Sequence, residues 1–127
     1  MKMTEPLRLN YEFARVYKRG VFISGRYVVL HAFLRPKNVR SGARPVPSDK
    51  NRLGVAASRK VKNAVTRNRA RRLLRESYRL MENELEPGYD LILTMKDIDP
   101  LPAFSEVQKE MLSLFRRAHM IGRGSGE

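Results

Sequence analysis

The sequence predicts an α+β fold, a sandwich in which one mixed sheet of about four strands packs with three helices. Segments with apolar residues three or four positions apart, as on one side of a helix, alternate with short β-branched and aromatic runs. In chain order these segments read α-β-β-β-α-β-α. The chain has 127 residues, 42% of them hydrophobic, which is enough apolar material for the core of one domain. We therefore assign residues 1–121 to a single domain and 122–127 to a flexible tail.

The first part of the chain predicts an extended lead-in over residues 1–9 and then a short helix. Asn10 is a suitable N-cap and Gly20 a suitable stop. The apolar side of this helix comprises Phe13, Val16 and Tyr17. Phe13 and Tyr17 lie one turn apart, so they either pack on the core or form a platform on which bases stack.

Strands are predicted at 21–23, 26–34 and 52–58, from their β-branched and aromatic content or their place in the pattern. Residues 36–51 contain three of the seven prolines and predict a mobile, basic connection between two strands. Small residues such as Gly54 indicate that another part of the chain approaches the last of these strands closely.

A long helix follows, with Asn63 as its predicted N-cap and an end near Glu84. The strand 89–95 includes the run Leu-Ile-Leu and is predicted to lie in the middle of the sheet. The last helix begins either at Ser105, in a capping box with Gln108, or nearer Ala103. If the strands that flank the long helix are parallel, chain geometry alone predicts a right-handed crossover.

Charge restricts the possible partners. The chain has 26 Lys and Arg against 13 Asp and Glu, a net charge of +13, which indicates a polyanion or an anionic membrane surface. It has no cysteine, which excludes disulfides and thiolate chemistry, and no apolar run long enough to cross a bilayer. We expect a cytoplasmic protein.

The long helix carries most of this charge. Glu76 is the only acid between Arg59 and Arg79, a stretch with nine cations. These cations are Arg59, Lys60, Lys62, Arg67, Arg69, Arg71, Arg72, Arg75 and Arg79. The apolar side of the helix contains Ala70, Leu73, Leu74, Tyr78 and Met81, with the arginines opposite or flanking it. Because like charges repel along a helix, this arrangement predicts a nucleic-acid ligand.

No catalytic set is recognisable in the sequence. A glycine-rich phosphate loop and a spaced Ser/His/Asp set are both missing, and the two histidines, His31 and His119, are far apart. Asp97 and Asp99 are interpreted as turn residues. We predict no catalytic residue, no metal ligand and no bound cofactor on this chain.

The stretch from Arg52 to Arg75 closely resembles the protein subunit of bacterial ribonuclease P. The matching motifs are Ser58-Arg59-Lys60, Ala64-Val65, Arg67-Asn68-Arg69-Ala70-Arg71-Arg72 and Arg75-Glu76. The first helix matches at Asn10, Phe13, Val16, Tyr17, Lys18 and Gly20. The resemblance runs from about Leu7 to Met120, and its central motif is the specific part.

The resemblance implies a ribonucleoprotein endonuclease that removes the 5′ leader of precursor tRNA and leaves a 5′-phosphate. In that enzyme the RNA subunit holds Mg²⁺ and performs the hydrolysis, while the protein binds the RNA subunit and the leader. It also implies a left-handed crossover between the parallel strands. We predict one protein per RNA and, on the sequence arguments given below, no DNA or membrane partner.

The resemblance assigns roles to residues. Arg69, Arg72 and Arg75 match positions that bind the RNA subunit. The residues that match leader or precursor-tRNA contacts are Phe13, Tyr17, His31, Arg59, Lys60, Arg67, Asn68 and Arg71. His31 departs from the aromatic residue of some members, Lys62 replaces a frequent glycine, and Ala70 is smaller than the usual Ile or Leu.

Other classes of protein fit the sequence less well. A non-enzymatic RNA-binding protein of the ribosome-associated type is the alternative, since the same charge pattern would serve it. A membrane-surface helix is disfavoured because the apolar side of the basic helix has a sheet to pack on. A helix-turn-helix DNA-binding protein is disfavoured because strands, not a second helix, precede the basic helix.

Overall fold

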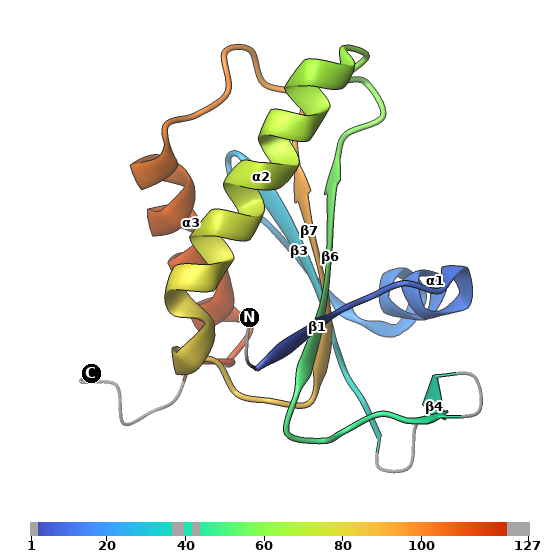
Figure 1. The fold of residues 1–127 in the computed structure, drawn as a ribbon. Coiled ribbons are helices and arrows are strands. Elements are labelled where there is room, and N and C mark those ends of the chain that lie inside the picture. Colours follow the sequence, from blue (N-terminus) through green and yellow to red (C-terminus); the bar gives the residue numbers. More distant parts are fainter. Residues whose placement is uncertain (1–2, 37–39, 42–43, 122–127) are drawn as a thin grey trace.

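The computed structural model describes residues 3–36, 40–41 and 44–121, and one five-stranded sheet lies between its helices (Figure 1). The helices are α1 (Asn10–Arg19), α2 (Ala64–Met81), the 3-10 turn η1 (Glu82–Glu84) and α3 (Phe104–Arg117). The strands of the sheet are β1 (Thr4–Pro6), β2 (Val21–Ser24), β3 (Val28–Leu34), β6 (Asn51–Ala57) and β7 (Tyr89–Met95). A small hairpin is formed by β4 (Arg40–Ser41) and β5 (Arg44–Pro45). The predicted α+β class is confirmed, whereas the predicted tail lies outside the described residues.

The sheet has the order β1-β6-β7-β3-β2 and is mixed. β1 and β7 both run parallel to β6, while β3 is antiparallel to β7 and to β2. The prediction of about four strands missed β1, since the extended lead-in pairs with the start of β6. Pro6 is compatible with this place because an edge strand does not need every N–H. β7 lies in the centre of the sheet, as predicted from its apolar run.

The crossover from β6 through α2 to β7 is left-handed. In Figure 1 the chain rises along β6, descends through α2 on the left and rises again along β7, which lies behind β6. The right-handed prediction from chain geometry is therefore wrong, and the hand implied by the family resemblance is confirmed.

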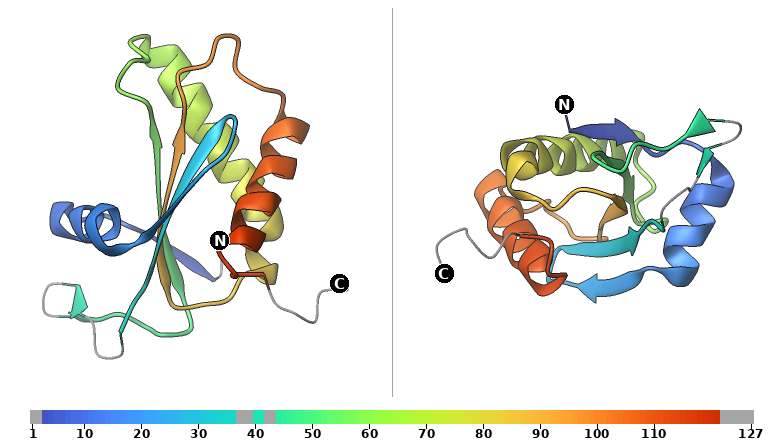
Figure 2. Two further views of the ribbon diagram at one scale, coloured as in Figure 1. Left: turned by 180° about the vertical axis from the view of Figure 1, so that it is seen from behind. Right: turned by 90° about the horizontal axis from the view of Figure 1, so that it is seen from below.

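The two faces of the sheet are covered differently. α2 and α3 cover one face, and α1 lies on the other (Figure 2). The main core lies under α2 and α3 and includes Leu30, Leu74, Tyr78, Leu93 and Phe115. A much smaller cluster lies under α1, with Leu7, Val16, Phe33 and Ile92. The α1 face is thus only partly sealed.

The N-terminal caps show which local predictions were correct. Asn63 caps α2, since its side-chain oxygen accepts hydrogen bonds from the backbone of Val65 and Thr66 at 2.8 and 3.2 Å. Asn10 is not a cap, because it is already the first residue of α1; Leu9 holds the cap position, and its N–H donates to the Glu12 carboxylate at 3.2 Å.

The start of α3 favours one of the two predicted positions. Ala103 precedes the helix, and its N–H donates to Glu106 at 2.9 Å. The capping box at Ser105 is therefore wrong and the start near Ala103 is confirmed. In each of α1, α2 and α3, a side chain accepts a hydrogen bond from a backbone N–H at the start of the helix that would otherwise be unpaired.

Candidate RNA-binding surface

A buried ion network fastens α1 to the sheet. Asp90 of β7 accepts hydrogen bonds from Arg35 at 2.8 Å, from Arg52 at 2.8 and 2.7 Å, and from Arg15 of α1 at 3.3 Å. Arg52 also pairs with Glu12 of α1. Burial lowers the pKa of the Arg35 guanidinium, and the hydrogen bond to Asp90 opposes this effect. The network thus fixes α1 over one half of the sheet face on which this helix lies.

The other half of that face remains open to solvent. Side chains alternate between the faces of a strand, so β3, β6 and β7 each present further residues beyond α1. The half-buried residues of this open floor are Val29, His31, Ala56 and Thr94. The floor is therefore made of small or uncharged side chains, with His31 beside Tyr17 of α1.

Three rings form a continuous surface beside this floor, which we call the aromatic surface: Tyr17, Phe22 and His31. The His31 ring lies 4.8 Å from that of Tyr17 and 5.1 Å from that of Phe22, between ring centres. Tyr17 is 49% exposed and Phe22 is 64% exposed. These rings have area left for a ligand, so the predicted residues Tyr17 and His31 come together on an accessible surface.

Phe22 is the member that the sequence did not reveal. Its strand was predicted, but the side of the sheet to which each residue points depends on pairing. In the structure Phe22 is directly opposite His31 in the antiparallel pair β2–β3, which places both rings on one face.

Partial burial lowers the pKa of His31. Its Nδ1 has no hydrogen-bond partner among the described residues. The ring is therefore predominantly neutral at pH 7 and offers a stacking face, while its Nδ1 is buried away from solvent.

Phe13 was predicted either to pack on the core or to form part of a stacking surface, and its ring both packs on the sheet and borders a hollow. Its ring packs on Gly54, where a Cβ would lie 2.6 Å from the ring, which explains the small residue in β6. It also lines a hollow of about 450 Å³ at the open edge of β6, together with Val55 of β6 and Arg75 of α2. Phe13 is thus a half-buried part of the wall, and Arg75 reaches the same hollow from the opposite layer.

The remaining basic residues divide into structural and unpaired groups. Arg67 donates to the carbonyls of Ser58 and Val61, both at 3.0 Å, and so holds the link between β6 and α2. Arg71 donates to the Asn68 side chain at 3.0 Å. Arg67 and Arg71 are half-buried, and both are positioned by these contacts.

Arg69, Arg72 and Arg75 are exposed on α2 and form no ion pair with any residue that the structure describes. Arg59 and Lys60 are exposed in the link before the helix. These side chains are available for phosphate groups, which guanidinium groups bind in bidentate fashion. The predicted RNA-subunit residues are therefore accessible.

The parts of the chain that the structure describes bring no three His, Cys, Asp or Glu side chains together in a group that could hold a metal ion. None of the described helices combines the length and the apolar character that crossing a bilayer requires. His119 lies just after α3 with a positive φ of 59°, away from the aromatic surface.

The chain is similar to known proteins over most of its length. A sequence model of the Ribonuclease P family matches residues 1–119. The ribonuclease P protein component of Clostridium novyi is 36% identical over 118 residues, covering 93% of this chain and 96% of that protein. That of Clostridioides difficile is 33% identical over 115 residues, covering 90% of this chain and 91% of that protein.

Solved structures share the fold. The RNase P protein of Thermotoga maritima matches with a TM-score of 0.69 at 25% identity, covering 89% of this chain and 96% of that one. That of Staphylococcus aureus matches with a TM-score of 0.68 at 21% identity, covering 94% of this chain and 98% of that one.

Proposed function

The chain belongs to the ribonuclease P protein family, and from this we propose how it divides its surface between two RNA ligands. As the protein component of a ribonucleoprotein nuclease that processes tRNA, it binds RNA. We assign the exposed arginines of α2 to the catalytic RNA subunit and the α1 face of the sheet to the 5′ leader of precursor tRNA.

The aromatic surface is the observation that carries the leader assignment. An unpaired strand is bound by stacking its bases on aromatic rings, at about 1–3 kcal/mol per base. Tyr17, Phe22 and His31 supply adjacent rings, two of them about half exposed or more. The open floor beside them leaves room for bases and contains no carboxylate. In a duplex the faces of the bases are already stacked inside the helix and cannot lie on such rings, which favours the single-stranded leader.

The basic residues near the link complete this contact. Arg59, Lys60, Arg67, Asn68 and Arg71 lie at the end of β6 and the first turns of α2. The arginines and the lysine neutralise leader phosphates and release counterions, and Asn68 adds an uncharged hydrogen-bonding group. Arg67 and Arg71 are preorganised by their own hydrogen bonds, so binding orders fewer side chains.

Catalysis belongs to the RNA subunit in this proposal. Mg²⁺ held by that RNA would supply the activated water and the charge stabilisation for hydrolysis, which would leave a 5′-phosphate on the mature tRNA. The residues of this chain bind and orient: arginines offset the repulsion between two RNA backbones, and the aromatic surface retains the leader. The holoenzyme should therefore bind precursor tRNA, which has a leader, more tightly than mature tRNA, which has none.

Cleavage in trans tests the subunit assignment. The purified chain is mixed with a bacterial ribonuclease P RNA and a precursor tRNA, with Mg²⁺ low enough that the RNA alone is nearly inactive. We expect protein-dependent cleavage at the mature 5′ end, lost when Arg69, Arg72 and Arg75 are all changed to Ala. Tight RNA binding without any cleavage would instead favour the non-enzymatic RNA-binding alternative.

The leader assignment has its own test. Tyr17→Ala should lower the affinity of the holoenzyme for precursor tRNA by about tenfold, as expected for one stacked base, and leave mature tRNA affinity unchanged. Tyr11→Ala removes an exposed tyrosine from the same helix and is the matched control. Equal loss for both tRNAs, or no loss, would contradict the assignment.

A further inference from the structure

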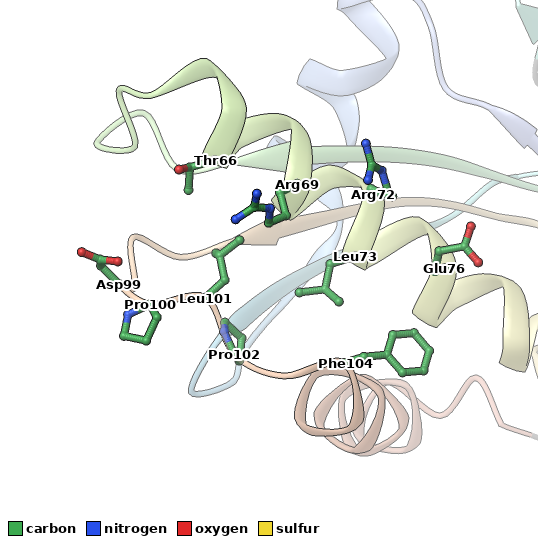
Figure 3. Close-up of a pocket in the computed structure, with 10 residues that line it drawn as sticks. All are labelled: Thr66, Arg69, Arg72, Leu73, Glu76, Asp99, Pro100, Leu101, Pro102 and Phe104. Atoms are coloured by element: carbon green, nitrogen blue, oxygen red, sulfur yellow. The ribbon is translucent and has the colours of Figure 1, made fainter.

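A second hollow, here called the α2–α3 pocket, lies on the other side of the sheet from the aromatic surface. It has a volume of about 460 Å³, within the range of small-ligand pockets. α2 forms one wall, and the connection from β7 into α3 forms the other (Figure 3). Its lining residues are Thr66, Arg69, Arg72, Leu73, Glu76, Asp99, Pro100, Leu101, Pro102 and Phe104.

The floor of the α2–α3 pocket is apolar. Figure 3 shows Leu73, Leu101 and Pro102 in the space between the two walls, with Phe104 at the first residue of α3. Leu73 and Leu101 are half-buried against the main core, whereas the Phe104 ring is 38% exposed. An exposed ring beside an apolar floor provides a surface on which a flat ligand can stack.

The rim carries cations without partners. Arg69 and Arg72 are exposed and form no ion pair with the described residues. Two guanidinium groups next to an apolar floor would be left unpaired by an apolar helix or peptide. They suit a ligand that combines a flat apolar ring with phosphate, which is the chemistry of a nucleotide.

Two carboxylates distinguish this pocket from a simple phosphate contact. Glu76 and Asp99 line it, although acids repel a phosphate backbone. A carboxylate is useful on an RNA surface when it accepts a hydrogen bond from a base amino group or a ribose hydroxyl. Glu76 already accepts from Arg79 through Oε1 at 2.8 Å, and that neighbouring cation reduces the repulsion.

We propose that the α2–α3 pocket binds one unpaired nucleotide of the RNA subunit, with its base on Leu73, Leu101 and Phe104 and its phosphate on Arg69 and Arg72. The proposal rests on the assignment of these arginines to the RNA subunit. It adds a base-binding contact to what would otherwise be backbone recognition alone. The leader is a separate ligand, because the aromatic surface lies on the opposite face of the sheet.

The test measures affinity for the RNA subunit without any tRNA. Phe104→Ala should weaken binding by about fivefold or more, as expected for one lost stacked base. Phe104→Tyr keeps an aromatic ring and should bind the RNA subunit as tightly as the wild type does. Leu80→Ala, which removes a 51% exposed apolar side chain from α2 outside this pocket, is the matched control and should change affinity less than twofold. Thermal unfolding of each variant shows that it is folded.

Salt dependence and base protection make the test specific. Phe104→Ala should leave the slope of log affinity against log salt unchanged, because no phosphate contact is lost, whereas Arg69→Ala should reduce it by about 1. Wild-type protein should protect one unpaired base of the RNA subunit from dimethyl sulfate. Phe104→Ala should lose that protection and Leu80→Ala should keep it.

The outcomes separate this proposal from the proposed function. If the wild-type protein binds the RNA subunit and supports cleavage, but Phe104→Ala binds and protects as wild type does, the pocket proposal alone is overturned. A Phe104→Ala defect confined to precursor tRNA would place the leader in the pocket and also overturn it. If the wild-type protein neither binds the RNA nor supports cleavage, both proposals fail.

Discussion

Three arginines that meet between α1 and the sheet and three arginines on α2 have the same side chain but opposite surroundings. Arg35 and Arg52 are buried and Arg15 is half-buried, and all three donate to the carboxylate of Asp90. The arginines of the α2 group, Arg69, Arg72 and Arg75, are exposed and have no carboxylate partner among the described residues.

Net charge alone therefore does not locate a binding surface. A guanidinium that is removed from water must be paired with an acid. The arginines under α1 therefore stabilise the fold and are not available to a ligand. An exposed guanidinium without an acid keeps its charge for a ligand. The region under α1 positions the aromatic surface, and the region on α2 supplies the charge for RNA.

Removing the acid that the arginines under α1 share should lower stability the most. Asp90→Asn leaves three arginines with a neutral partner and should lower the free energy of unfolding by about 3–5 kcal/mol. Glu76→Gln breaks an exposed pair with Arg79 and should cost about 0–1 kcal/mol. Denaturant unfolding of the free protein measures both. Equal losses of stability for the two variants would show that the ion network under α1 does not hold α1 on the sheet.

The second effect concerns binding and not stability. Changing Arg69, Arg72 and Arg75 together to Ala should weaken RNA-subunit binding on the order of 100-fold at moderate salt and reduce the salt slope by about 3. Unfolding should change by no more than about 0.5 kcal/mol. Arg116→Ala with Arg117→Ala removes two exposed charges from α3 and is the control. A similar loss there would indicate that only total charge matters.

Gly54→Ala separates the two regions. The added Cβ would lie 2.6 Å from the Phe13 ring, so this ring must move, with or without α1, at about 1–3 kcal/mol of stability. We expect weaker discrimination of precursor from mature tRNA and unchanged affinity for the RNA subunit. A parallel loss in both affinities would show that the two regions are not independent.

The smallest effect is a pH dependence on the α1 side only. Burial lowers the pKa of His31 in the folded protein, while the unfolded value is about 6.5. As pH falls below that value, the unfolded chain takes up the proton more readily, so stability is lost; above about pH 7.5 this contribution is constant. His31→Phe should therefore lose less stability between pH 7.5 and 5.5 than the wild type. Identical losses of stability in the two proteins would show that His31 is not the source of this pH dependence.

Much of this arrangement could be predicted from local patterns. The core side of α2, its cap at Asn63 and the central place of β7 all follow from residue types at fixed spacings. The α2 arginines were found in the same way, because helical periodicity separates a charged side from an apolar side.

Other features depended on partners far along the chain. β1 exists only because β6 is beside it. Phe22 joins the aromatic surface because pairing places it opposite His31. The α2–α3 pocket needs a connection that begins well beyond the helix. None of these features leaves a signal within one segment.

Local residue patterns are enough to specify the order and type of the main elements and the concentration of positive charge on α2, since both depend on neighbours within a few turns. Tertiary structure decided the hand of the crossover, the half of the sheet that α1 leaves open and which arginines remain free. Arg52 meets Asp90 across 38 residues and Glu12 across 40. Whether a guanidinium is buried with an acid or exposed to a ligand is set by such distant pairs, because the hydration and pairing of a charge depend on everything packed around it.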